Sequence, residues 1–187
     1  MIPIVGFYTE KTPYEKEAQE LIANAQSFNL VPLVHKVPSR GNWEANCQIK
    51  AEVLAQTADQ LSVPFLYVDV DARFAKYPVL FDYQLHKDYD IGLHFFRGSE
   101  LLSGTIWINP TIETKGTLEE WRLSNLERPK EWDQRNLQHI INKSPKLRIL
   151  RLPCEYAFIH DLSERHYGAC DPVIVHYQAS RKYKRRV

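Results

Sequence analysis

The sequence predicts an α/β protein with a mixed, mostly parallel sheet flanked by helices. Over residues 2–71, apolar runs typical of strands alternate with stretches of helical periodicity, in the order strand, helix, strand, helix, strand. This order favours parallel strands joined by right-handed crossovers. The run that begins at Phe65 is apolar without polar alternation, as in a strand buried on both faces. At 187 residues, with no linker rich in glycine or serine, one domain is expected.

The elements of the first third can be placed from their boundaries. Ile2–Thr9 is a strand, and the next helix begins near Thr12, which has the spacing of a capping box with Glu15. Leu30–Val37 is the second strand. Asn42 is expected to cap a second helix that ends near residue 61, and the strand in the stretch Phe65–Arg73 is expected to leave the sheet at Asp69 and Asp71.

Beyond residue 73 the pattern is less regular but still alternates. The expected elements are strands at Asp88–Phe96 and Ser103–Asn109, helices at Thr117–Glu127 and Trp132–Asn142, and strands at Leu147–Leu152 and Val173–Tyr177.

Charge and cysteine content limit the classes of function. The chain carries 24 lysines and arginines against 23 aspartates and glutamates, so its net charge does not indicate a nucleic-acid or a membrane partner. Five of the last seven residues are basic, which indicates a local anion site. Three cysteines without a C-x-x-C pair favour a reducing compartment. No run is long enough for a membrane span, so a cytoplasmic protein is expected.

Asp69 and Asp71 follow the buried strand directly. In open α/β sheets, ligands bind at the carboxyl ends of the strands. The pair is therefore a candidate site for a divalent cation and the phosphates of a nucleotide. The alternative is a solvated turn in which both aspartates cap the next segment.

A second candidate lies near the C-terminus, where the apolar run Val173–Val175 ends in His176 and Lys182 follows. An imidazole can bind a cation and an ammonium can bind a phosphate. The alternative is an ordinary hydrogen-bonded histidine beside a solvated basic tail.

Four segments, in this order, resemble the nucleotide-diphospho-sugar glycosyltransferases of the GT-A fold. They are the strand and D-x-D of residues 66–71, the stretch Ser103–Thr111, the dipeptide Asp133-Gln134, and His176 with Lys182. The resemblance spans nearly the whole chain. It implies one Rossmann-like domain, in which residues 1–72 form a nucleotide-binding half and residues 73–187 an acceptor and catalytic half.

The resemblance also implies roles for single residues. Asp69, Asp71 and His176 would hold Mn²⁺ or Mg²⁺, with Asp69 also near the donor ribose, and Lys182 would bind the diphosphate. Relatives often have a glycine between the histidine and the lysine, where this chain has Ala179 and Ser180.

Four further residues are expected near the donor. Tyr8 and Thr9 would line the base pocket, unless the tyrosine is a core residue. Lys50 would contact the donor phosphate or sugar, unless it only extends along its helix into water. Gly104 would let backbone approach the transferred sugar, unless it is a bulge glycine.

Asp133 and Gln134 would lie beside the anomeric carbon. If the enzyme inverts, Asp133 is the expected general base; if it retains, the same carboxylate positions sugar hydroxyls. The alternative is that Asp133 simply favours the positive end of its helix.

Arg97, Trp107 and Asn109 are candidates for the acceptor side, although Arg97 could equally be a surface arginine and Trp107 core. The acceptor would be a glycan, a protein or a modified DNA base. The DNA base is included because compact transferases that resemble this chain occur in phages. A phage enzyme would act in the host cytoplasm. Two other functions stay open. They are nucleic-acid binding through the tail and aromatic residues without turnover, and nucleotidyl transfer.

Overall fold

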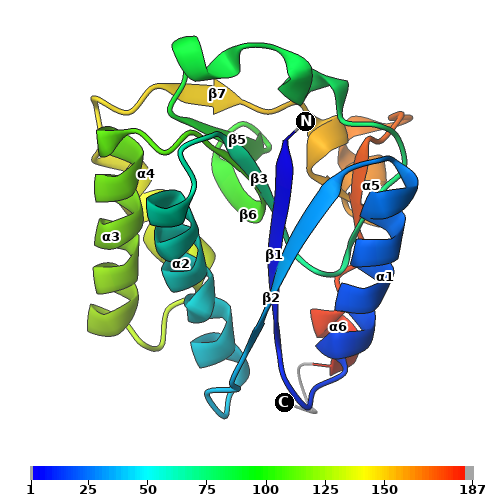
Figure 1. Ribbon diagram of the computed structural model, residues 1–187, viewed down its shortest axis with the longest axis horizontal. Coiled ribbons are helices and arrows are strands. Elements are labelled where there is room, and N and C mark those ends of the chain that lie inside the picture. The colour runs from blue at the N-terminus through cyan, green and yellow to red at the C-terminus, as the bar shows by residue number, and fades with distance from the viewer. Residues whose placement is uncertain (1, 184–187) are drawn as a thin grey trace.

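The structure, a computed structural model, describes residues 2–183, and in it helices cover both faces of a central sheet (Figure 1). One face is covered by α2 (Trp43–Gln60), α3 (Ile112–Glu127) and α4 (Asp133–Asn142). The other face carries α1 (Tyr14–Ser27) and the shorter α5 (Ser163–Tyr167) and α6 (Ser180–Tyr183). No helix among these residues combines the length and hydrophobicity needed to cross a membrane.

The central sheet has six strands in the order β2-β1-β3-β6-β5-β7. Their bounds are β1 Pro3–Thr9, β2 Val31–Val37, β3 Phe65–Val68, β5 Ile91–Phe96, β6 Glu100–Ile108 and β7 Ile149–Arg151. β6 runs antiparallel to both of its neighbours and the other pairings are parallel, which confirms the mixed, mostly parallel sheet. Because β6 is reversed, its middle lies beside the carboxyl end of β3, where Val68 pairs with Thr105.

A second, three-stranded sheet brings the end of the chain to the same edge. It contains β4 (Ala72–Phe74), β9 (Ile174–His176) and β8 (Phe158–Ile159), in that order. Ala72 pairs with His176 in the antiparallel β4–β9 ladder. His176 is thereby fixed next to the turn that follows β3. Three 3₁₀ helices complete the described elements: η1 (Val79–Asp82), η2 (Leu85–Lys87) and η3 (Cys154–Tyr156).

The side chains of β3 alternate between two hydrophobic cores. Phe65 and Tyr67 pack in the core shared with α2, α3 and α4. Leu66 and Val68 pack in the core shared with α1 and the second sheet. All four are buried, which confirms a strand covered on both faces.

The strand from Phe65 ends at Val68, directly before the aspartates as predicted, and a turn in which the Ala72 amide donates to the Asp69 carbonyl at 2.9 Å redirects the chain into β4. One local prediction is wrong. Thr12 does not form a capping box: its hydroxyl donates to the Thr9 carbonyl at 2.6 Å. The predicted Asn42 cap is confirmed, since its side chain accepts from the Ala45 amide.

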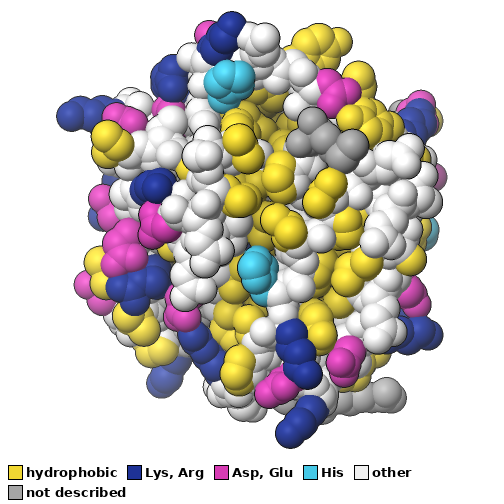
Figure 2. Space-filling view, viewed as in Figure 1, with side chains coloured by type: hydrophobic (Ala, Val, Ile, Leu, Met, Phe, Trp, Pro, Cys, Tyr) yellow, Lys and Arg dark blue, Asp and Glu magenta, His cyan; other side chains and the backbone are white. Residues whose placement is uncertain are grey.

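The edge strand β2 carries exposed apolar side chains on the face shown in Figure 2, where hydrophobic surface gathers between α1 and α2. Val31 is 47% and Leu33 37% exposed.

Candidate active site

Two adjoining clefts open at the carboxyl ends of β1 and β3. The space within and at the mouth of the first is about 660 Å³, and that of the second about 500 Å³. Asp69, Asp71 and Ser180 line both clefts and so mark the boundary between them. The parallel pairing of β1 with β3 explains the shared position, since strands running the same way end at the same edge.

The first cleft is aromatic. Phe7, Tyr8 and Thr9 line it from the end of β1, as predicted for the last two. Tyr14 at the start of α1 and Trp43 at the start of α2 also line it. Flat rings along a cleft suit a planar heterocycle.

Asp69, Asp71 and His176 converge although more than one hundred residues separate the aspartates from the histidine. One ligand atom from each lies within 4.8 Å of the others. His176 Nδ1 is 3.8 Å from Asp71 Oδ1, and its Nε2 is hydrogen-bonded to the Thr105 hydroxyl at 2.8 Å. The contact at Nε2 orients the ring and turns Nδ1 toward the carboxylates, an arrangement common in metal sites.

The two carboxyl groups differ in their environment. Burial raises the pKa of Asp69, and the Lys50 ammonium only partly opposes this. Burial also acts against ionisation of Asp71, but the imidazole of His176 and the Ala179 amide lower its pKa below the ordinary value. That amide donates to Asp71 Oδ2 at 2.8 Å. Ala179 thus fixes Asp71 through its backbone amide.

The residues present fit a hard divalent cation. Two carboxylates and an imidazole are ligands that Mn²⁺ accepts, and Mg²⁺ prefers the oxygens among them. Gly104 leaves space among them: a Cβ there would lie 2.9 Å from His176 Cε1 and 3.1 Å from Nδ1, with Asp69 Oδ2 at 3.4 Å. Gly104 also accepts the Asp69 amide at 2.9 Å, so its backbone does approach the site.

Lys50 lies under the first cleft and is only 5% exposed. Its ammonium is 3.0 Å from Asp69 Oδ1 and 3.3 Å from Asp133 Oδ2, and it donates to the Ser103 carbonyl and hydroxyl at 3.1 and 3.2 Å. The alternative that Lys50 extends into water is therefore wrong. Burial alone would lower the pKa of Lys50, but Asp133 and Asp69 outweigh it and raise the pKa, which keeps the ammonium charged.

Asp133 and Gln134 begin α4, as predicted, but face different surroundings. Asp133 is buried, and its carboxylate contacts Lys50 and lies 3.5 Å from the Ser103 hydroxyl. Gln134 lines the second cleft and accepts the Ser103 amide at 3.2 Å. Gly104, Thr105 and His176 line the same cleft.

Five predicted site residues line neither cleft: Asp133, described above, and Arg97, Trp107, Asn109 and Lys182. Trp107 is 2% exposed in the core that β3 shares with α1, so the acceptor role is corrected to a core role. Asn109 donates to the carbonyls of His86 and Tyr89 at the opposite end of β6, which ties it to the η2 region. Arg97 is exposed in the turn between β5 and β6, and its guanidinium stacks on Phe96.

Lys182 is exposed on α6, two residues after Ser180. The basic residues predicted to form an anion site at 184–186 lie outside the described residues.

Sequence reasoning missed several residues at the site. Tyr67 donates to Asp69 Oδ1 at 2.6 Å. The two-residue spacing within and just beyond β3, which places alternate side chains on one face, is the signal that points to this pair. Ser103 contacts Lys50 and Thr105 contacts His176. A register shift in β6 between Leu102 and Ile106 interrupts the alternation of side chains there, so spacing alone could not assign these two residues.

Comparisons with known proteins agree with this geometry. Residues 42–186 match the family model described as nucleotide-diphospho-sugar transferase. A glycosyltransferase involved in the glycosylation of the major capsid of PBCV-1 superposes with a TM-score of 0.74 at 16% identity, covering 98% of this chain and 96% of that one.

Two further solved structures show the same fold. The glycosyltransferase GlyE of Streptococcus pneumoniae TIGR4 gives a TM-score of 0.66 at 14% identity; all of this chain aligns, to 56% of GlyE. The galactosyltransferase LgtC, in complex with donor and acceptor sugar analogs, gives 0.53 at 14% identity over 95% of this chain and 87% of that one. No curated protein matches by sequence.

Proposed function

The chain belongs to the nucleotide-diphospho-sugar transferase family, and we propose that it uses a divalent cation to transfer a sugar from a nucleotide-diphosphate donor to a hydroxyl acceptor. The observation that carries the proposal is the convergence of Asp69, Asp71 and His176 at the boundary of two clefts. A family model does not specify the cation; these three side chains argue for one.

The first cleft is the proposed nucleotide site. All of its lining residues except Ser180 lie between positions 7 and 71, which supports a nucleotide-binding role for residues 1–72. Phe7, Tyr8 and Tyr14 would contact the base, and Thr9 has a hydroxyl for a polar contact. The diphosphate would then lie at the boundary of the clefts, beside Asp69 and Asp71.

Asp69, Asp71 and His176 Nδ1 are the proposed ligands of Mn²⁺ or Mg²⁺. The ion supplies positive charge to the diphosphate as the bond to the sugar breaks. Asp69 is fixed for this role by Tyr67 and Lys50, and Asp71 by the Ala179 amide. Lys182 is the proposed second positive charge for the diphosphate, on the short helix that begins at the cleft residue Ser180.

The second cleft is the proposed site of the transferred sugar and the acceptor, which gives residues 73–187 the acceptor and catalytic role. Gln134 and Gly104 line it and would face the sugar. Asp133 is held by Lys50, so we propose that it acts as a positioning residue for that lysine. A general-base role would require its carboxylate to leave the ammonium at 3.3 Å. Anomeric analysis of the product by NMR distinguishes inversion, which needs a base, from retention.

A donor screen tests the function without knowledge of the acceptor. A panel of nucleotide sugars is incubated with the protein in Mn²⁺, in Mg²⁺ and in chelator, and the released nucleotide is measured. We expect one donor to yield nucleoside diphosphate and free sugar in the metal-containing samples only, and the same diphosphate with Mn²⁺ to raise the melting temperature. Pyrophosphate as product would indicate nucleotidyl transfer instead. The proposal is refuted if no nucleotide sugar is hydrolysed and no nucleotide shifts the melting temperature.

Acceptor classes are then compared with the identified donor. Glycans, a protein substrate and hydroxymethylated DNA are supplied in turn, and transfer is measured by mass spectrometry. The apolar Leu102, Ala157 and Ile159 line the second cleft and suit the face of a sugar ring or a base, so they do not separate these acceptors.

A further inference from the structure

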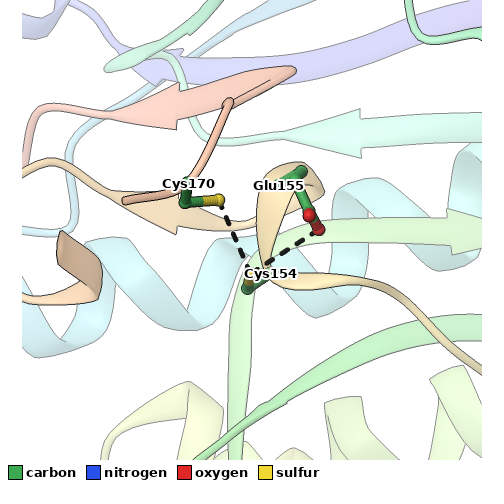
Figure 3. Close-up of side chains that lie close together, drawn as sticks. All are labelled: Cys154, Glu155 and Cys170. Carbon is green, nitrogen blue, oxygen red and sulfur yellow. Dashed lines mark hydrogen bonds between the residues drawn. The ribbon is translucent and has the colours of Figure 1, made fainter. Parts of the chain in front are cut away.

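Cys154, Glu155 and Cys170 form a second cluster of metal-ligating side chains, distinct from the two clefts (Figure 3). Cys154 and Glu155 begin η3, whereas Cys170 lies in the segment between α5 and β9. The two sulfurs are 3.6 Å apart, and Cys154 Sγ is 3.5 Å from Glu155 Oε2. All three side chains are half-buried, so an ion can reach them from solvent.

These separations match the edges of a tetrahedral zinc site. With Zn–S bonds of about 2.3 Å and Zn–O bonds of about 2.1 Å, tetrahedral angles place two sulfurs about 3.8 Å apart and a sulfur and an oxygen about 3.6 Å apart. We propose that Cys154, Glu155 and Cys170 bind a thiophilic divalent cation of the zinc class, with water as the fourth ligand.

The geometry favours a metal over a disulfide. A disulfide requires the sulfurs to approach to about 2.05 Å, about 1.5 Å closer than they lie, and it would leave the carboxylate of Glu155 without a role. Charge also favours a metal. Among residues 2–183 no basic side chain forms an ion pair with Glu155, and the nearby Lys76 pairs with Asp171 instead. A divalent ion would supply the missing positive charge.

A bound ion would tie η3 to the segment that leads into β9. The Val173 amide already donates to the Glu155 carbonyl at 2.8 Å, and Val173 immediately precedes β9. Since His176 is the last residue of β9, the proposed ion would stabilise the strand that presents this imidazole. The zinc-class site does not depend on the proposed transfer reaction.

Cobalt binding tests the site directly. The reduced, metal-free protein is titrated with Co²⁺ and followed by absorption, because cobalt bound to thiolates gives an intense sulfur-to-metal charge-transfer band. We expect one equivalent to give this band, Zn²⁺ to displace the cobalt, and Zn²⁺ to raise the melting temperature by about 5 °C. Asp71→Ala should leave the band unchanged, since the carboxylate–imidazole cluster contains no sulfur.

Cysteine variants assign the ligands. Cys154→Ser and Cys170→Ser should each weaken Zn²⁺ binding at least about 100-fold, and the matched Cys47→Ser should not change it. If a variant fails to fold, alkylation of the wild-type chain gives the same answer. Zn²⁺ should then protect Cys154 and Cys170, with no effect on Cys47. The proposal is overturned by the absence of a thiolate band, by a band that persists in both variants, or by a reductant-sensitive Cys154–Cys170 crosslink that forms in air despite saturating Zn²⁺.

Discussion

The two clusters of metal-ligating side chains differ in both donor atoms and surroundings. Asp69, Asp71 and His176 offer oxygen and nitrogen beside two clefts, and Lys50 supplies a positive charge to one carboxylate. Cys154 and Cys170 offer sulfur away from the clefts, and among the described residues no basic side chain forms an ion pair with the adjoining Glu155. Donor chemistry therefore favours different ions at the two proposed sites. Oxygen and nitrogen ligands favour a hard, exchangeable ion, and thiolates favour a soft ion of the kind that stabilises structure.

The largest loss of activity is expected when a charge is removed from the carboxylate cluster, which consists of Asp69, Asp71 and His176. Asp71→Asn keeps the shape of the side chain but loses the negative charge opposite His176. We expect Mn²⁺-dependent nucleotide-sugar hydrolysis to fall about 10³-fold, measured as nucleoside diphosphate release, with the Co²⁺–thiolate band unchanged.

Asp59→Asn is the matched control, because Asp59 is an exposed aspartate at the end of α2 that pairs with Lys115. Hydrolysis in the control should stay within about twofold of wild type. An equal loss in both variants would mean that Asp71 does not act through the cation.

A variant of Lys50 tests how much its buried ammonium contributes to stability through the contacts with Asp69 and Asp133. Lys50→Met leaves Asp133 buried without its cation, and we expect unfolding free energy to fall by about 3 kcal/mol in urea. The double variant Lys50→Met, Asp133→Asn removes both charges and should regain more than half of that loss. If the double variant is as unstable as the single one, the ion pair is not the source of the effect.

The cluster around Asp69 shows how far sequence reasoning reached. Asp69 and Asp71 follow a strand that its apolar pattern predicts, and His176 ends another such strand. Each could therefore be proposed as a metal ligand from its local sequence. Their meeting depends on the second sheet, whose strands of two or three residues are too short for a periodic signal. The resemblance to a family supplied that long-range contact.

Trp107 shows the opposite limit. An aromatic residue in a strand has the same local signal whether it faces a ligand or the core. Its burial was decided by the packing of α1 and the second sheet over that face. The Cys154–Cys170 contact was missed for a related reason, because sixteen residues separate the thiols and no short motif joins them.

Gly104 tests the space at the carboxylate cluster with a smaller change. Gly104→Ala places a methyl group 2.9 Å from His176 Cε1, so the imidazole must shift. We expect Mn²⁺ to bind about 10-fold more weakly by calorimetry. Gly116→Ala is the control in α3, where an added Cβ meets nothing within 4 Å, and it should stabilise the protein by about 1 kcal/mol. Unchanged Mn²⁺ affinity in Gly104→Ala would place the ion elsewhere.

The smallest expected effect is the pH dependence of metal binding, which should differ between the two clusters. Asp71 has a lowered pKa and is ionised at neutral pH, while Asp69 has a raised pKa, so it is protonated first as pH falls. Mn²⁺ affinity should therefore hold above neutrality and decline on acidification through the raised Asp69 pKa, before an ordinary carboxyl at about 3.9 would titrate.

At the Cys154–Cys170 cluster, metal affinity should also fall as the pH falls, but the fall should begin at a higher pH. Burial and the neighbouring Cys170 raise the pKa of Cys154 to about 12, so Zn²⁺ must displace thiol protons throughout the accessible range. Calorimetry at about pH 8 in buffers of different ionisation enthalpy should give about two protons released per Zn²⁺ and fewer than about 0.5 per Mn²⁺. Equal proton release by both ions would mean that they share one set of ligands.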